Sequence, residues 1–130
     1  METIEQRSIR IINQLKVKYP HARAWDVDGR GMHFVSEIDP VDNHPEYDLA
    51  VEVIIESKPH KHLKMTQYYT VLSGILELHL GDEIVTLSPG DKRTIKPGTI
   101  HWALGKEGEC WTELYSEPGW TKEDHLVVEV

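Results

Sequence analysis

The side chains of this sequence that can do chemistry begin with two histidines one residue apart. His60 and His62 stand in the run PHKHLKMTQ, which continues to Gln67, and His101 follows much later in KPGTIH. Side chains alternate between the two faces of an extended strand, so the imidazoles of His60 and His62 point the same way. Convergent imidazoles bind divalent first-row metals, which need further ligands from elsewhere in the fold. His101 is the expected third ligand, and Gln67 can offer an amide oxygen.

The histidine pair alone does not establish a metal site, because two half-exposed histidines on one strand give the same pattern. His33, in the run MHFV, either lines a cavity or sits on the sheet, and we favour the sheet. The other histidines show no partner pattern, so we expect surface positions for His21, His44, His79 and His125.

The composition is that of one soluble globular domain. The chain has 130 residues, enough for one hydrophobic core and too few for two ordinary domains. Its formal charge of −8 is spread without a basic cluster, so we expect no nucleic-acid partner. Cys110 has no cysteine to pair with, and the charged start METIEQRSIR does not resemble a signal peptide. Because no apolar run is long enough to span a membrane, we expect a cytoplasmic protein.

The elements that must position the histidines are predicted to be short strands. Thr3 is a candidate helix N-cap and Pro20 a helix stop, which predicts one amphipathic helix within residues 1–20. From Trp25 onward, β-branched and aromatic runs alternate with turn signals, as is typical of an all-β sandwich or barrel. The predicted organisation is a helix at 1–20 packed on a barrel of residues 21–130. We expect strands at 32–38, 47–56, 68–80, 83–90, 93–104, 110–116 and 125–130.

Two turns follow from glycines within the apolar runs. Ser73-Gly74 lies between two apolar arms, which predicts a two-residue hairpin with glycine at positive φ. Gly81-Asp82 is predicted to form the next turn. Because the chain doubles back so often, the segment from His60 to Gln67 and His101 are expected on neighbouring or facing strands.

Together, the two histidine segments resemble the two motifs of the cupin superfamily. The run H-x-H-x4-Q-x6-G, from His60 to Gly74, resembles the first motif, in which a glutamate usually holds the place of Gln67. The segment PGDKRTIKPGTIHWALG, which contains His101, resembles the second. The resemblance implies an all-β, single-domain cupin, a double-stranded β-helix or jelly-roll barrel, with a short N-terminal helix. It also implies one divalent transition metal held by His60, His62, His101 and Gln67.

Gln67 is the informative departure from the cupin pattern. Three neutral imidazoles and an amide leave the double positive charge of the metal uncompensated, whereas a glutamate would cancel half of it. We therefore expect the site to bind a carboxylate, enolate or phosphate oxygen. Such ligands accept Mn, Fe, Ni, Cu and Zn alike, so the sequence does not select the metal. The alternative is that Gln67 hydrogen-bonds within the barrel and does not touch the metal.

The glutamine variant resembles the small cupins of pectin and alginate breakdown that convert unsaturated uronates to linear keto forms. This resemblance implies isomerisation, ring opening or tautomerisation of a small anionic or sugar-like molecule, with the metal as Lewis acid. In the run CWTELYS, Glu113 and Tyr115 share one face, and we predict that both line a cavity above the metal as catalytic residues. The alternative is that Glu113 faces solvent and that Trp111 and Tyr115 belong to the core.

Two other classes of function stay open. A three-histidine iron site with open positions resembles the cupin dioxygenases, and a non-catalytic module would bind a small anionic metabolite without turning it over. The tail TKEDHLVVEV is predicted to form a last strand or arm. An apolar edge strand of this kind can pair with a second copy of itself, which predicts a homodimer.

Overall fold

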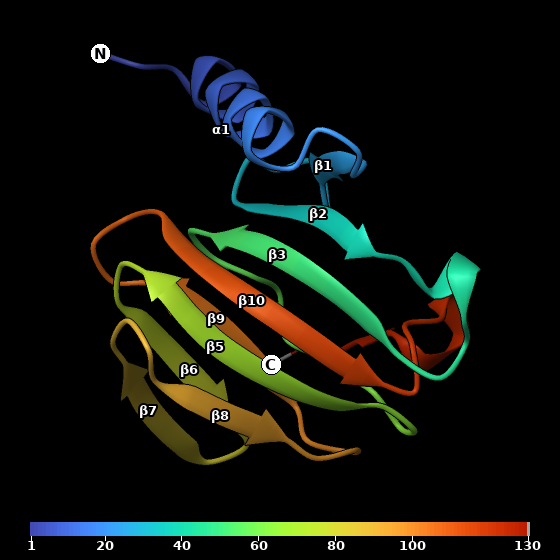
Figure 1. The fold of residues 1–130 in the computed structure, drawn as a ribbon. Helices are drawn as coiled ribbons and strands as arrows, with labels where there is room; N and C mark the ends of the chain where they lie inside the picture. Colours follow the sequence, from blue (N-terminus) through green and yellow to red (C-terminus); the bar gives the residue numbers. More distant parts are fainter. Residues whose placement is uncertain (130) are drawn as a thin grey trace.

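The structure, a computed structural model, describes residues 1–129 and consists of one helix packed outside two antiparallel sheets (Figure 1). Helix α1 spans Ile4–Lys18. The first sheet has the order β1-β2-β3-β10-β5-β8, with the bounds Ala24–Asp26, His33–Asp39, Asp48–Ile54, Cys110–Glu117, Thr66–Ser73 and Lys92–Ile95. The second has the order β11-β4-β9-β6-β7, with the bounds Leu126–Val127, His60–Lys61, His101–Gly105, Leu76–Leu80 and Glu83–Leu87. Two short 3-10 helices, η1 and η2, span Val41–Asn43 and Lys122–Asp124.

This architecture is the predicted all-β barrel with a leading helix. Thr3 caps α1 as expected: its hydroxyl oxygen accepts the Gln6 N–H at 3.0 Å, and the Gln6 amide oxygen accepts the Thr3 N–H at 2.9 Å. Ile11 and Leu15 are fully buried where α1 packs on the first sheet. Burial of each side chain contributes roughly 1.5 to 3 kcal/mol, so this contact is enough to hold the helix on the sheet. Their apolar neighbours are Phe34, Val51 and Val53.

The connection between β5 and β6 differs from the predicted hairpin. The two strands belong to different sheets, so the chain crosses between sheets at Gly74 and does not fold back on itself. Gly74 has a φ of 84°, and a Cβ there would lie 2.8 Å from the Glu109 carbonyl oxygen. Glycine is thus required here for a crossover. The second predicted turn is confirmed, because Gly81-Asp82 joins β6 to β7 with Leu80 opposite Glu83.

The space between the sheets divides into an apolar end and a hollow end. On β3, the inward positions run from Ala50 and Glu52, which line a cavity, to Ile54 in the apolar core. On β5 they run in the same way from Gln67, at the cavity, to Val71, in the core. The core therefore closes one end of the barrel, and the other end is left open for a site.

The predicted strand at 125–130 is realised in part, as β11, and Val130 lies outside the described residues. β11 pairs with β4, with Val127 opposite His60. No helix within residues 1–129 combines the length and the apolar character that crossing a membrane requires.

Candidate metal centre and cavity

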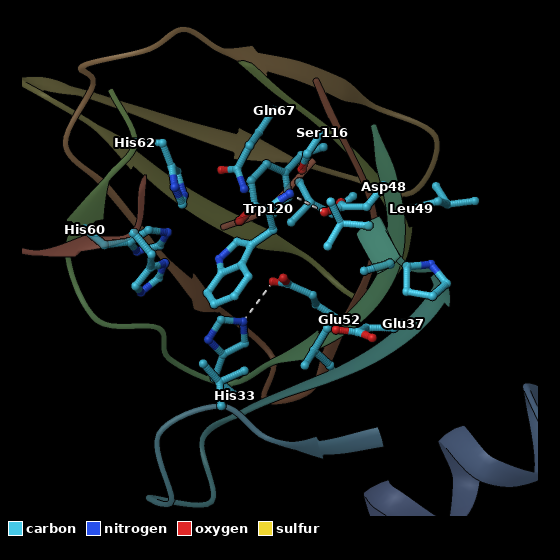
Figure 2. A pocket seen from close by; sticks show the side chains of 18 of the residues that line it. His33, Glu37, Asp48, Leu49, Glu52, His60, His62, Gln67, Ser116 and Trp120 are labelled. Atoms are coloured by element: carbon cyan, nitrogen blue, oxygen red, sulfur yellow. Dashed lines mark hydrogen bonds and ion pairs between the residues drawn. The ribbon is translucent and has the colours of Figure 1, made fainter. Parts of the chain in front are cut away.

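His60, His62 and His101 meet at the hollow end of the barrel. His60 lies on β4 directly opposite His101, the first residue of β9, and His62 follows two residues after His60. One ring nitrogen from each of the three lies within 4.8 Å of the others, and all three residues are buried. The expected convergence of these side chains is therefore observed, and Figure 2 shows His60 and His62 on the same side of the cavity.

Backbone carbonyls fix the orientation of all three rings. The Nδ1 atoms of His60 and His62 donate to the carbonyl oxygens of Lys58 and Asp124, both at 2.8 Å. The Nδ1 of His101 is 3.0 Å from the Thr99 carbonyl oxygen. A carbonyl only accepts, so each Nδ1 carries the hydrogen and each Nε2 keeps a lone pair. Histidines that bind metals show this arrangement, and the buried Nε2 atoms of His62 and His101 have no partner within residues 1–129.

Burial keeps these imidazoles neutral. Burial, together with the neighbouring His101, lowers the pKa of His60 to about 2. Burial likewise lowers the pKa of His101 to about 4 and lowers the pKa of His62. Neutral imidazole is the form that binds a metal. The three Nε2 atoms converge and carry lone pairs in place of protons, so they fit a divalent cation.

Gln67 lies on β5 and faces the same cavity. Its side chain is 4% exposed, and its amide oxygen Oε1 is buried without a hydrogen-bond partner in the described chain. A buried amide oxygen without a partner costs about 1 to 3 kcal/mol, and a cation in the cavity would remove that cost. The alternative, in which this oxygen is satisfied by a hydrogen bond inside the barrel, is not what the structure shows.

The C-terminal segment contributes to the site in a way that the sequence did not indicate. The Asp124 carboxylate accepts the backbone N–H groups of Leu63, Lys64 and Met65 at 2.8, 3.0 and 3.0 Å. Together with the carbonyl bond to His62, these contacts tie η2 to the loop that follows the first two histidines. Three donated hydrogen bonds hold the pKa of Asp124 below its usual range, although burial opposes this.

His125 was predicted at the surface, and that prediction is wrong. Its ring centroid is 4.8 Å from that of His60 and 5.4 Å from that of His62. It lines the cavity, and its Nδ1 is buried without a partner among residues 1–129. A histidine in a terminal segment gives no local signal of this placement, because the pairing of β11 with β4 brings it there.

The cavity has a volume of about 280 Å³ and three kinds of wall. The imidazoles and Gln67 form one side. An apolar wall contains Trp25, Val27, Val35, Val41, Leu49 and Trp120, and carboxylates enter from Glu37, Asp48 and Glu52. Burial raises the pKa of Asp48, and the charges of Glu37 and Glu52 raise it further. The cavity can therefore hold a small organic molecule that has both apolar and hydrogen-bonding faces.

His33 and Glu52 form a buried pair inside this cavity. The distance between His33 Nε2 and Glu52 Oε1 is 2.8 Å, and each residue is 8% exposed (Figure 2). The expectation that His33 merely sits on the sheet is wrong, because it lines the cavity. Glu52 was not singled out at all. The sequence does indicate this residue: in the run LAVEVI, a glutamate occupies an inward position of an otherwise apolar strand.

Glu113 and Tyr115 do share one face of β10, but that face is the outer one. The inward positions of β10 are held by buried Thr112, Leu114 and Ser116. Alternation then directs Glu113 to solvent and Tyr115 to an outer aromatic group, 5.6 Å from Tyr47 between ring centroids. The expectation that both line the cavity is therefore wrong, and neither is among the cavity residues.

Comparison with known proteins supports the fold. Residues 51–110 match the family model described as a cupin domain. No curated protein matches the sequence. Similar solved structures include Pac13 from Streptomyces, a nucleoside dehydratase, at 19% identity over 85% of this chain and 88% of that one, with a TM-score of 0.71.

Two other solved structures are similar over most of their length. KdgF from Halomonas sp. is 22% identical over 78% of this chain and 91% of that one, with a TM-score of 0.66. The polyketide cyclase RemF from Streptomyces resistomycificus is 17% identical over 86% and 83%, with a TM-score of 0.70. Identities this low establish a shared fold and not a shared reaction. With two packed sheets, a central segment (residues 51–110) that matches the cupin domain, and both histidine motifs in place, this chain has the cupin fold.

Proposed function

We propose that this protein is a metal-dependent enzyme that isomerises, ring-opens or tautomerises a small carbohydrate-derived or anionic metabolite. The observation that carries the proposal is the set of three buried imidazoles whose Nδ1 atoms are held by carbonyls. Their free lone pairs converge at the wall of a cavity large enough for a small metabolite. A core histidine cluster without a ligand would leave these groups unsatisfied.

In this proposal His60, His62 and His101 hold one divalent ion of the series Mn, Fe, Ni, Cu and Zn, and Gln67 adds its amide oxygen. When bound, the ion supplies Lewis acidity toward a carbonyl, hydroxyl or carboxylate oxygen. The four protein ligands carry no charge, so an anionic oxygen is favoured at the centre. Asp124 and the carbonyls of Lys58 and Thr99 keep the ligands oriented before the ion arrives.

The other walls fit a sugar-like molecule. Trp25 and Trp120 offer flat apolar surfaces on which the C–H face of a sugar ring can pack. Glu37 and Asp48 offer acceptors for hydroxyl groups.

The deciding experiment is metal analysis followed by an assay. Protein purified without chelator is expected to hold one ion per chain, and the double variant His60→Ala/His62→Ala is expected to hold none. The loaded protein is then incubated with unsaturated uronates, keto sugars and their isomers, and conversion is followed by NMR. Stoichiometric metal in the double variant would refute the site.

The same samples separate the other two classes of function. Oxygen consumption by the iron-loaded protein with a diketone or aromatic substrate would identify the dioxygenase class. Measurable binding of a panel member without turnover by any metal form would identify a binding module. Either result would replace the isomerase proposal.

A further inference from the structure

The His33–Glu52 pair is the most unusual feature of the cavity that the metal does not explain. The pair sits on β2 and β3, while Ile54, the next inward residue of β3, belongs to the apolar core. Burying a charged or polar pair is expensive, and an apolar pair of similar volume is often as stable or more stable. Packing alone therefore does not account for a glutamate and a histidine at these positions.

The geometry leaves one carboxylate oxygen available. Glu52 Oε1 accepts the His33 Nε2–H at 2.8 Å, whereas Oε2 has no hydrogen-bond partner within residues 1–129. Glu52 lies in the middle of β3, which is flanked by β2 and β10, so its backbone is held on both sides. Figure 2 shows the Glu52 carboxyl group directed into the cavity from the wall formed by β2 and β3. A fixed carboxylate with one free oxygen is suited to accept a proton.

The carboxylate also lies within electrostatic reach of the metal centre. Burial lowers the pKa values of His62 and His101, while the charge of Glu52 raises both of them. The other two cavity carboxylates have different partners: Glu37 Oε2 pairs with Arg23 at 2.8 Å, and Asp48 Oδ2 accepts the backbone N–H of Trp120 at 2.6 Å. Among the cavity carboxylates, Glu52 is thus the one that is held by a buried histidine.

We propose that Glu52 is the proton-transferring residue of the cavity and that His33 is its positioning residue. This inference rests on the proposed function and deepens it, because it names the substrate class: carbonyl compounds whose neighbouring carbon carries both a hydrogen and a hydroxyl group. The C–H bond breaks, its proton bonds to Glu52 Oε2, its electron pair becomes the C=C bond of an enediolate, and the C=O π pair moves onto the carbonyl oxygen. The proton then returns from Oε2 to the former carbonyl carbon, while the hydroxyl proton passes to the former carbonyl oxygen. The hydroxyl and carbonyl groups thereby exchange places without an oxidant or reductant.

Acetohydroxamic acid tests this role without knowledge of the substrate. This small acid binds metal centres as its anion, so its O–H proton must pass to a protein group or to the buffer. Titration calorimetry of the Co²⁺-loaded protein in buffers of different ionisation enthalpy counts the protons that the buffer receives. The wild-type protein is expected to release close to none, because Glu52 captures the proton. Glu52→Gln is expected to release about one proton per site.

Three further variants define the roles. Glu113→Gln removes a carboxylate from the outer face of neighbouring β10 and is expected to release as few protons to the buffer as wild type. His33→Gln keeps an N–H donor for Glu52, so its proton release is expected to stay near that of wild type. His33→Leu lacks this donor, and its proton release is expected to rise toward that of Glu52→Gln. Glu52→Asp keeps a carboxylate and serves as a second variant should Glu52→Gln fold poorly. It is expected to release less than the full proton.

The outcomes separate this inference from the metal proposal. Failure of the wild-type protein to bind Co²⁺, read from its visible absorption, refutes the metal centre. Intact Co²⁺ binding with equal proton release by wild type, Glu52→Gln and Glu52→Asp refutes only the role of Glu52. Absence of acetohydroxamic acid binding by the loaded wild-type protein also overturns it, because a proton acceptor beside the centre should capture this acid.

Discussion

At the scale of single residues, the sequence most clearly predicts the charge of the proposed metal ligands, which is zero because Gln67 is not a glutamate. Gln67 is buried in the cavity with an unpartnered amide oxygen, in a position where a cupin usually carries a glutamate. The structure adds Glu52, which places a carboxylate in the same cavity but outside the histidine cluster. The cavity therefore has a carboxylate at Glu52 and none among the proposed ligands, and at Glu52 the negative charge can act on a bound molecule.

Gln67→Glu is expected to weaken the binding of acetate to the Co²⁺-loaded protein. An added unit charge about 4 Å away costs about 1 kcal/mol in water and about 4 kcal/mol at an effective dielectric constant near 20. Acetate affinity should therefore fall at least roughly fivefold, as measured by visible absorption. Gln67→Met removes the amide without adding charge and is the control. Equal or tighter acetate binding by Gln67→Glu would show that charge at this position does not control anion binding.

At the scale of elements, the site depends on a segment distant in sequence. η2 supplies Asp124, which holds the loop after His62 and the ring of His62 itself. The sequence predicted the two histidine motifs because each is local and its alternation is regular. It could not predict Asp124 and His125, because their roles depend on β11 pairing with β4. The crossover at Gly74 was missed for a similar reason, since a positive φ serves a hairpin and a crossover equally well.

Asp124→Ala is expected to destabilise the protein and to weaken metal binding together. Three backbone N–H groups lose their acceptor, and a buried donor left unsatisfied costs about 1 to 3 kcal/mol. We expect a fall in the free energy of unfolding within or above that range in urea, and a weaker affinity for Co²⁺. Glu123→Ala changes an exposed neighbour and should leave both values unchanged. Full Co²⁺ affinity in Asp124→Ala would contradict the positioning of His62 by this segment.

Helix α1, by contrast, is expected to act on stability alone. Leu15 is fully buried between α1 and the first sheet, on the face opposite the cavity. Leu15→Ala should cost about 2 to 5 kcal/mol in the free energy of unfolding, with Co²⁺ affinity unchanged in the remaining folded protein. Val17→Ala, at an 83% exposed position of the same helix, is the matched control. A parallel loss of Co²⁺ affinity would show that the helix also supports the site.

At the scale of the whole molecule, the barrel divides stability and function between its two ends. Leu76, Leu78 and other apolar side chains close one end, and the histidines, Gln67 and Glu52 occupy the other. The alternation of apolar residues predicted this fold class, because burial of one strand face decides it. Alternation could not say which inward positions fill the core and which line the cavity. That division placed Glu52 in the site, whereas Glu113 lies outside it because it is on the outward face of β10.

Metal binding is expected to stabilise the entire barrel, since the proposed ligands come from β4, β5 and β9 and the loop after β4. At a free metal concentration of 100 Kd, the free energy of unfolding should rise by about 2.7 kcal/mol relative to the chelator-treated protein. Thermal and urea unfolding with and without metal measure the difference. The variant His60→Ala/His62→Ala should show none, and an equal rise in this variant would place the ion elsewhere.

The homodimer remains a prediction of the apolar tail. β11 is an edge of the second sheet, as the predicted pairing of two copies requires. Light scattering coupled to size exclusion should give twice the mass of one chain, and Val127→Lys on that edge should lower it. A mass of one chain for the unaltered protein would contradict the prediction.

The bond between His62 and the Asp124 carbonyl sets an order of events during protein synthesis. The first two histidines leave the ribosome early, but the carbonyl that orients His62 is added only some sixty residues later. On a nascent chain that ends before these residues, the proposed ligand set is incomplete, because His101 and η2 are still to come. At the proposed metal site, an ion would therefore meet the complete, oriented set only after translation has passed residue 124.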